Sequence, residues 1–364
     1  ALRAVPTLHN HAELPANNNN ITAKHFIVGV VMAAALVRAL VGLFAVGAGE
    51  ARRTSLAMQY KPLRRHANLF EDWTEWVHPP LLHAIRSSNA SALLDLLREE
   101  AGGGDSSGVY SLPLFLDAEG GCAFCDLLLD ELDGYYASGL PIERPNSMNN
   151  YGIIVNAIGM RPAIDRLQAA VLHPLAALLY PEQAEGGFTS HHSFMVKYKA
   201  GQDLGLDMHT DDSDVTVNVC LGKDFRGAAL TVCGDSRSPS HRQFYASYSH
   251  ERGRALLHLG SRRHGADDIA SGERNNLIVW NQNARYQVPR LARLRQPAAV
   301  LARGGPARQA LPELHARPRL RRLHSLPARP RGVPRARLVP SRLRVLRQHG
   351  ACPQEGRAVK LRGA

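Results

Sequence analysis

Residues 208–222 read MHTDDSDVTVNVCLG, and this stretch decides the fold class because it joins a short polar motif to an apolar strand. Val215–Leu221 is rich in β-branched residues and follows a cluster of Asp and Ser, which is the pattern of a buried strand entered through a turn. Similar short runs occur at Phe194–Tyr198, Ala228–Cys233, Ala255–Leu259 and Asn276–Trp280. Because no helical run separates them, these strands predict a β-sandwich or jelly roll.

Residues 55–185 have a different pattern, which predicts a mainly helical support region. Ala90–Glu100 and Cys122–Tyr136 are amphipathic runs. After Pro162, five apolar residues fall on one helical face: Ile164, Leu167, Val171, Leu175 and Leu178. Pro174 should kink or split this last helix. We therefore expect an α+β chain with a mainly β core, in which N-terminal helices support a domain over 186–285.

The N-terminal 49 residues contain two further segments. Residues 1–25 are polar and include Asn17–Asn20, which predicts a disordered lead-in. Residues 26–49 are apolar except for Arg38 and are long enough to cross a bilayer core of about 30 Å as a helix. We expect a signal anchor or signal peptide there, and with it a membrane-anchored, endomembrane location. A buried amphipathic helix in a soluble protein is the alternative.

Most of the positive charge lies at the C-terminal end. Residues 290–364 hold 19 of the 44 Lys and Arg but 2 of the 32 Asp and Glu, which leaves 25 basic and 30 acidic residues in the rest of the chain. Such a composition predicts a disordered Arg/Pro-rich tail, and a reading frame translated out of phase would produce the same composition. The acidic body argues against a nucleic-acid partner bound in a basic groove. A membrane-tethered protein with a nucleic-acid-binding tail is a further alternative.

Five cysteines are too few and too scattered for the disulfide framework of a small secreted protein. Cys122 and Cys125 form a lone C-x-x-C motif at the start of a helix-like run. Buried thiols in a helix are the simplest interpretation of this motif, with a redox or zinc site as the alternative.

The H-x-D motif at His209 and Asp211 is the first candidate for chemistry. In an extended strand, positions i and i+2 project to the same face, so the imidazole and the carboxylate should converge. His264 follows the strand Ala255–Leu259 and could supply a third ligand. Two His and one carboxylate leave positions open on a metal, which suits Fe(II) with a chelating co-substrate and O₂, although zinc would also accept this set.

Arg274 lies ten residues after His264, at the start of the apolar strand Asn276–Trp280. From there it can point into the same barrel. A buried guanidinium needs a carboxylate, and its planar fork matches one with two parallel hydrogen bonds. The distal carboxylate of 2-oxoglutarate would provide that partner. An exposed Arg274 paired with Glu273 or Asp268 is the alternative.

Four elements in this order and spacing resemble the prolyl 4-hydroxylase-type branch of the 2-oxoglutarate- and Fe(II)-dependent dioxygenases: Tyr198-x-x-Gly201, His209-x-Asp211, His264-Gly265, and Arg274 with Trp280. The stretches RPNSMNNYG at 144–152, SHH at 190–192 and SGER at 271–274 are similar to a eukaryotic subgroup of Fe2OG dioxygenase domain-containing proteins. The resemblance covers about 140–283.

This resemblance implies a double-stranded β-helix, a cupin-like jelly roll, with N-terminal supporting helices. It implies iron bound by His209, Asp211 and His264, with Tyr198 and Arg274 on the carboxylate of 2-oxoglutarate. The implied reaction hydroxylates an unactivated C–H bond and decarboxylates 2-oxoglutarate to succinate. A peptidyl proline or lysine is the first substrate to consider, a small molecule or lipid the second. L-ascorbate is the implied reductant.

Two other functions remain open at this point. A jelly roll that has lost turnover would act as a binding module, although we expect such a protein to lack a ligand or the Arg, and this sequence has all four. A zinc-dependent hydrolase would use the same three ligands around a water molecule. It would need a nearby general base and has no use for Arg274. Thr216 and Asn218 should face the interior, whereas His191 and His192 should be structural or rim residues, and His258 a surface or packing residue.

Overall fold

The computed structural model describes residues 49, 51–100, 108–243, 245–287 and 352 of the chain. The predicted lead-in over 1–25 lies outside them, as do the apolar segment over 26–49 apart from Gly49 and the Arg/Pro-rich tail over 290–364 apart from Cys352. Among the described residues, no helix combines the length and apolar character that a bilayer crossing needs.

Two antiparallel sheets form the body of the protein. The larger sheet has the strand order β1-β2-β10-β6-β12-β4-β3, and β7 pairs with one end of β12. Its strands are β1 (Arg98–Glu99), β2 (Tyr110–Pro113), β3 (Gly152–Ile153), β4 (Ser190–Lys199), β6 (Val215–Gly222), β7 (Phe225–Gly227), β10 (Arg254–Leu259) and β12 (Ile269–Gln282). The five predicted strands are confirmed as parts of β4, β6, β8, β10 and β12.

The smaller sheet has the order β5-β11-β8-β9. Its strands are β5 (Leu206–His209), β8 (Leu230–Asp235), β9 (Ala246–Tyr248) and β11 (Arg262–Ala266). From β4 onward the chain crosses repeatedly between the two sheets: β4, β6, β10 and β12 belong to the larger one, and β5, β8 and β11 to the smaller one. This alternation makes the fold a double-stranded β-helix with a mainly β core, as expected.

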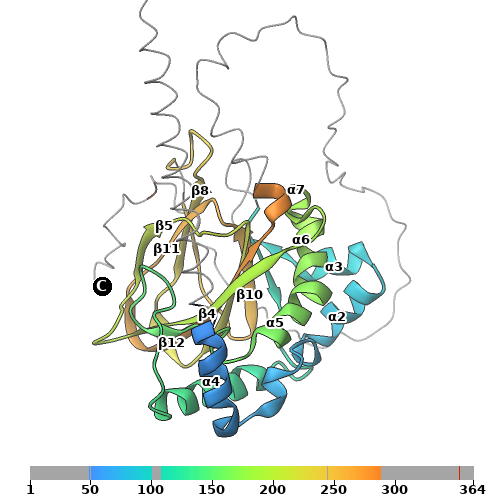
Figure 1. Cartoon of the computed structure of the whole chain (residues 1–364). Helices are drawn as coiled ribbons and strands as arrows, with labels where there is room; N and C mark the ends of the chain where they lie inside the picture. The colour runs from blue at the N-terminus through green and yellow to red at the C-terminus, as the bar shows by residue number, and fades with distance from the viewer. Residues whose placement is uncertain (1–48, 50, 101–107, 244, 288–351, 353–364) are drawn as a thin grey trace, which may run out of the picture.

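Side chains alternate strictly along β12, the longest strand. Leu277 and Val279 belong to the large core under the helices, whereas Ile278 packs in a second cluster that also contains Phe194 and Ala266. This is the two-residue period of a strand buried on both faces. One face of the larger sheet therefore packs on helices, and the other faces the smaller sheet (Figure 1).

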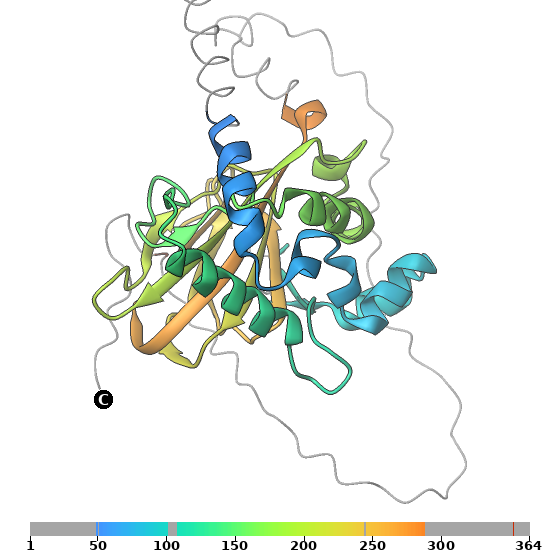
Figure 2. The same cartoon turned by 60° about the horizontal axis from the view of Figure 1, so that its bottom comes forward.

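Helices cover the outer face of the larger sheet, and the helix over 51–60 runs beside them (Figure 2). The short 3-10 helices are η1 (Lys61–Leu63), η2 (Ala67–Phe70) and η3 (Thr74–Trp76). The longer elements are α2 (Pro79–Arg86), α3 (Ala90–Leu96), α4 (Ala123–Ala137), α5 (Arg161–Leu167), η5 (Gln168–Leu172), α6 (His173–Leu179) and α7 (Pro181–Ala184). Aromatic rings fix α4 in this layer, since Phe124 stacks on Phe115 with centroids 3.9 Å apart.

The predicted helix after Pro162 is split ahead of Pro174, as expected. The segment Gln168–Leu172 is a π-helix, and α6 begins at the residue before the proline. A π-turn inserts one extra residue and so rotates the following turns about the axis. Leu178 is therefore exposed and not on the buried face, which corrects the prediction, while Ala176 is buried in the core.

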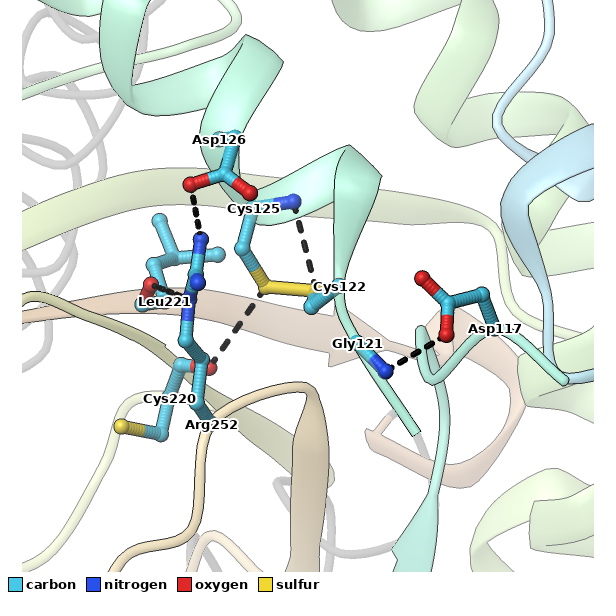
Figure 3. Close-up of a disulfide and its surroundings, with 8 residues drawn as sticks. All are labelled: Asp117, Gly121, Cys122, Cys125, Asp126, Cys220, Leu221 and Arg252. Atoms are coloured by element: carbon cyan, nitrogen blue, oxygen red, sulfur yellow. Dashed lines mark hydrogen bonds and ion pairs between the residues drawn. A yellow bond between two sulfur atoms is a disulfide. The ribbon is translucent and has the colours of Figure 1, made fainter. Parts of the chain in front are cut away.

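Two further predictions about this region need correction. The run Ala90–Glu100 is not one helix, because α3 ends at Leu96 and residues 98–99 form β1. Cys122 and Cys125 are not thiols but a disulfide at the start of α4, beside the buried free Cys220 of β6 (Figure 3). The helix itself, Ala123–Ala137, matches the predicted run. A second disulfide joins Cys233 to Cys352.

Three strands of the larger sheet come from the segment predicted to be helical support. β1 and β2 extend the sheet beyond β10, and β3 pairs with β4. The helical region and the jelly roll therefore share one sheet. The boundary at 185 and 186 stays a prediction.

Candidate metal centre

Neighbouring strands of the smaller sheet bring two histidines together. His209 ends β5, and His264 lies directly opposite it in β11. Their ring centroids are 4.3 Å apart. Asp211 lies just beyond the end of β5, where its backbone N–H donates to the carbonyl of Gly260 at 2.9 Å. This bond turns the chain so that the carboxylate reaches the same point as the two rings.

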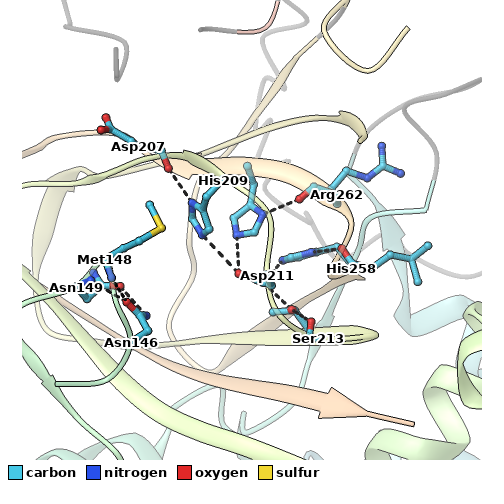
Figure 4. Close-up of polar contacts among 12 residues, drawn as sticks. Asn146, Met148, Asn149, Asp207, His209, Asp211, Ser213, His258 and Arg262 are labelled. Carbon is cyan, nitrogen blue, oxygen red and sulfur yellow. Dashed lines mark hydrogen bonds and ion pairs between the residues drawn. The ribbon is translucent and has the colours of Figure 1, made fainter. Parts of the chain in front are cut away.

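The candidate ligand atoms form a compact group. His209 Nε2 is 3.5 Å from Asp211 Oδ1, and His264 Nε2 is 3.6 Å from the same oxygen. One ligand atom from each of the three residues lies within 4.8 Å of the others. Figure 4 shows His209 and Asp211 pointing toward one another at this place. Atoms at these separations can all contact a single ion at about 2.0–2.2 Å.

Backbone carbonyls fix the orientation of both imidazoles. His209 Nδ1 lies 2.7 Å from the carbonyl oxygen of Asp207, and His264 Nδ1 lies 2.9 Å from that of Arg262. Each Nδ1 can only donate to such a partner, so each Nε2 carries the lone pair in the neutral ring. A hydrogen bond of this kind on the outer nitrogen is typical of metal-binding histidines.

The carboxylate is held just as firmly. Thr216 Oγ1 donates to Asp211 Oδ2 at 2.6 Å, and Ser213 Oγ lies 2.7 Å from the same hydroxyl. Oδ2 is thus occupied, while Oδ1 faces the histidines. The prediction that Thr216 and Asn218 face the interior is confirmed, because both line the cavity at this site.

The charges of these groups suit metal binding at neutral pH. Burial raises the pKa of Asp211, but the surrounding histidines outweigh burial and hold that pKa well below its usual range. Burial lowers the pKa of His264 to about 3, so its ring is neutral. Burial also lowers the pKa of His209, but the hydrogen bond and charge of Asp211 raise it above the ordinary value. A metal bound here would place a positive charge beside the carboxylate.

His258 is a buried neighbour of the site; it was predicted as a surface or packing residue, and its packing contacts include the candidate ligands. It is fully buried, its Nε2 lies 3.9 Å from Asp211 Oδ2, and its ring centroid is 4.5 Å from that of His264. It lies opposite Thr216 in the ladder of β10 and β6. Since Thr216 was predicted to face the interior, this cross-strand position was the signal that could have revealed His258.

Arg274 and Tyr198 come to the same cavity from β12 and β4. They are direct partners in the ladder, and the guanidinium carbon lies 4.7 Å from the centroid of the Tyr198 ring. Arg274 is 1% exposed; its Nε donates to Asn276 Oδ1, and its Nη1 donates to the carbonyl of Ala228. Within the described residues it forms no ion pair. The alternative of an exposed Arg274 paired with Glu273 or Asp268 is therefore wrong.

These side chains share one narrow cavity between the two sheets. His209, Asp211 and His264 line it together with Tyr198 and Arg274, and apolar residues such as Phe194, Ile278 and Trp280 form much of the remaining wall. Its volume is about 40 Å³, which is room for roughly three waters. A ligand that reaches both the imidazoles and Arg274 must therefore displace side chains that now occupy this space.

The loop before β3 also contributes to the cavity, which the sequence analysis missed. Asn146 and Asn149 line it, and Asn149 Nδ2 donates to the hydroxyl of Tyr198 at 3.4 Å. The side-chain oxygen of Asn146 accepts from the backbone N–H groups of Met148 and Asn149 (Figure 4). These residues lie in the RPNSMNNYG stretch, so their position was marked only by resemblance.

The donor set fits Fe(II). Two imidazole nitrogens and one carboxylate oxygen leave positions open for a chelating ligand and for O₂. A zinc hydrolase would have no use for the buried guanidinium of Arg274, which lines the same cavity. The buried cation of Arg274 in the same cavity needs an anionic partner.

The chain is similar in sequence to proteins described as 2-oxoglutarate and iron-dependent oxygenase domain-containing proteins. The OGFOD2-like domain family matches residues 56–185. The human "2-oxoglutarate and iron-dependent oxygenase domain-containing protein 2" is 36% identical over 234 residues, which cover 63% of this chain and 65% of the human protein. The protein of the same description named ICU11 from Arabidopsis thaliana is 38% identical over 173 residues, which cover 45% of this chain and 44% of that protein. The chain thus spans slightly less than two thirds of the human relative.

Solved structures with a similar arrangement are more distant. A prolyl-4-hydroxylase from Pseudomonas putida is 15% identical, with a TM-score of 0.34, and the match covers 57% of this chain and 96% of that one. A prolyl 4-hydroxylase from Phytophthora capsici is 16% identical, with a TM-score of 0.40, and the match covers 61% of this chain and 72% of that one.

Proposed function

We propose that this chain is a 2-oxoglutarate- and iron-dependent oxygenase of the prolyl 4-hydroxylase type and that it hydroxylates an unactivated C–H bond of its substrate, in line with its similarity to the OGFOD2-like domain family and to oxygenase domain-containing proteins. The observation that carries this proposal is the pairing of two features in one cavity. Three metal-binding side chains line the same space as a buried guanidinium that forms no ion pair with the residues the structure describes. Iron and 2-oxoglutarate together satisfy both.

We assign iron binding to His209, Asp211 and His264. The hydrogen bonds to the outer imidazole nitrogens and to Asp211 Oδ2 hold these ligands in place before the metal arrives. Little reorganisation is then needed on binding, which favours both affinity and a defined geometry. Iron with bound 2-oxoglutarate and O₂ supplies the oxidising chemistry, and 2-oxoglutarate leaves as succinate and CO₂.

We assign the distal carboxylate of 2-oxoglutarate to Arg274 and Tyr198. The guanidinium donates to neutral oxygens of Asn276 in β12 and of Ala228 between β7 and β8, and it forms no ion pair within the described residues. A carboxylate would balance its positive charge with charge-assisted hydrogen bonds in a dry site. Burial raises the pKa of Tyr198, so its hydroxyl stays protonated and can donate as well.

The apolar wall of the cavity has a separate role. Phe194, Ile278 and Trp280 come from β4 and β12 and pack against one another there. Excluding water strengthens the electrostatic contacts of Arg274 and prevents side reactions of the oxidant. The protein thus contributes positioning and exclusion of water, while the co-substrates contribute the bond-breaking chemistry.

For the substrate, we propose a peptidyl proline or lysine, in line with the prolyl 4-hydroxylase-type family. We propose L-ascorbate as the reductant that keeps the metal ferrous. The predicted anchor over 26–49 would place this activity at an endomembrane surface.

The experiment that tests the central proposal is succinate formation from 2-oxoglutarate by the full chain, purified without oxygen and supplied with Fe(II) and ascorbate. We expect turnover that is lost, together with iron binding, in His209→Ala. The matched control is His83→Ala, because His83 is an exposed histidine of α2. Unchanged iron occupancy in His209→Ala would rule out the ligand assignment.

The substrate proposal has a separate readout. Peptide libraries that contain Pro or Lys are incubated with the active protein, and products that gain one oxygen atom are identified by mass spectrometry. Binding of Fe(II) and 2-oxoglutarate without succinate, even in the presence of these peptides, would favour the non-catalytic binding module.

A further inference from the structure

A second and larger cavity lies on the helical side of the molecule. It has a volume of about 400 Å³ and is bounded by the helix over 51–60, η1, the start of α5 and the beginning of β4. Cavities of this size are typical of small-molecule binding sites. The proposed oxygenase reaction makes no use of it.

The lining of this cavity is basic. Arg53, Lys61, Arg64 and Arg161 line it, and none of the lining residues is acidic. Two carboxylates lie nearby: Glu143 is 3.4 Å from Arg53, and Asp165 is 4.0 Å from Arg161. Asp165 also accepts a hydrogen bond from the buried His191. Four cations thus face these two carboxylates and, at Arg64, the charge of Glu131, which still leaves an excess of positive charge.

Lys61 and Arg64 account for that excess. Neither forms an ion pair within the described part of the chain, and Arg64 Nε is buried without a hydrogen-bond partner. The guanidinium carbon of Arg64 lies over the ring of Phe70, 3.6 Å from its centroid. Burial lowers the pKa of Arg64, the direction expected for a cation deprived of water. Stacking fixes the plane of the fork, so its donors are already oriented for an anion.

Gly159 makes this position of Arg64 possible. A Cβ at Gly159 would come within 2.6 Å of Arg64 Nη2, and its φ of +100° is one that residues with side chains rarely adopt. The backbone and the guanidinium thus lie close together here, and the positive φ favours glycine at this position. The cavity has the features of a built site, with a fixed cation and a cleared space.

His192 separates this cavity from the candidate metal centre. Its ring lines the second cavity and also contacts Phe194 and Trp280, which line the first, at centroid distances of 4.9 and 5.7 Å. Its Nε2 lies 2.9 Å from the carbonyl oxygen of Pro145. The two cavities are neighbours with one aromatic wall between them. A ligand in the second cavity could therefore bind without contacting the metal.

We propose that this cavity binds a phosphate-bearing small molecule. Several converging cations match a multiply charged anion better than a single carboxylate, and arginine and lysine are the usual partners of phosphate. The limited volume favours a small molecule over an extended polypeptide.

The test uses inorganic pyrophosphate as the probe and isothermal titration calorimetry on the full chain at moderate salt. We expect the wild type to bind, Lys61→Gln and Arg64→Gln each to lose at least about tenfold in affinity, and the double variant to show no binding. Arg65→Gln is the matched control. Arg65 is the adjacent exposed arginine, pairs with Asp130 at 2.7 Å and does not line the cavity.

Three results would overturn the proposal. One is the absence of pyrophosphate binding by wild-type protein that retains its thermal unfolding transition. Another is an equal loss of affinity in Arg65→Gln, which would indicate attraction to surface charge in general. Because Lys61 is exposed, its substitution should leave the fold intact and keeps the test valid if Arg64→Gln unfolds. Binding of a glutamate-rich peptide without pyrophosphate binding would also contradict a small-molecule site.

Discussion

Arg274→Met removes the guanidinium that we assign to 2-oxoglutarate while keeping an unbranched side chain of similar length. The change should weaken 2-oxoglutarate binding strongly. Hydrogen bonds to charged groups contribute about 1.5–3 kcal/mol each, and a carboxylate in the fork would form two. Even the lower figure gives a loss of about 3 kcal/mol, which corresponds to more than about a hundredfold in the dissociation constant.

The burial of Arg274 explains why the expected loss of 2-oxoglutarate affinity is large. The side chain is 1% exposed, so its interactions are not screened by solvent as a surface pair would be. Its present partners are the neutral oxygens of Asn276 and Ala228, so no carboxylate of the described residues replaces the lost co-substrate contact. Iron affinity should change little, because Arg274 forms no hydrogen bond to His209, Asp211 or His264.

The assay is calorimetric titration of 2-oxoglutarate into Mn(II)-loaded protein without oxygen, with Mn(II) affinity measured separately. Arg226→Met is the matched control, because Arg226 is an exposed arginine of β7. A dissociation constant for 2-oxoglutarate within about threefold of wild type would refute the assignment of Arg274. An equal loss of Mn(II) affinity would instead show that the substitution had disturbed the whole site.

Three further predictions concern the support of the site and the fold. Thr216→Val removes the hydroxyl that donates to Asp211 Oδ2, so Mn(II) affinity measured by titration should fall about tenfold or more. Glu131 is fully buried and accepts hydrogen bonds from Tyr60 and two backbone N–H groups, so Glu131→Ala should lower the free energy of unfolding in urea by about 3 kcal/mol; a change under about 1 kcal/mol would contradict this. Burial raises the pKa of Glu273, but a neighbouring amide and three lysines outweigh it and hold the pKa at about 2. A lowered pKa stabilises the fold above the ordinary value near 4.5 and loses this effect as pH falls toward 2, so Glu273→Gln should be less stable by about 1 kcal/mol at pH 7 and equal to wild type near pH 2.

Strands β4, β6, β8, β10 and β12 could be predicted because their sequences are rich in apolar and β-branched residues. β6 and the apolar half of β12 are buried on both faces, and such strands read as continuous hydrophobic runs. β11 could not be predicted in this way. Its sequence, RRHGA, is polar and carries no alternation, although every one of its residues is buried in the fold. Burial there comes from tertiary pairing with β5 and β8, which local sequence does not encode.

Some residues of the candidate site could likewise be predicted from local sequence, and others could not. The H-x-D spacing and the position of Arg274 brought four of its residues into view, and the structure brings them into one cavity. His258 and Asn149 were missed because neither has a partner at a recognisable spacing along the chain. Their proximity depends on the ladder between β10 and β6 and on a loop that folds over the cavity. Such residues can be identified only from the three-dimensional fold, not from sequence motifs.

Strand β12 also sets a limit on how this protein can evolve. It presents Arg274, Ile278 and Trp280 to the cavity, while Leu277 and Val279 face the helices. Insertion or deletion of a single codon between positions 274 and 280 would exchange these two faces for every residue beyond it and bury a charge or a cavity wall in the wrong layer. The segment can therefore diverge by substitution alone. Changes of length must accumulate in the loops between strands, and new specificities in this lineage would arise there first.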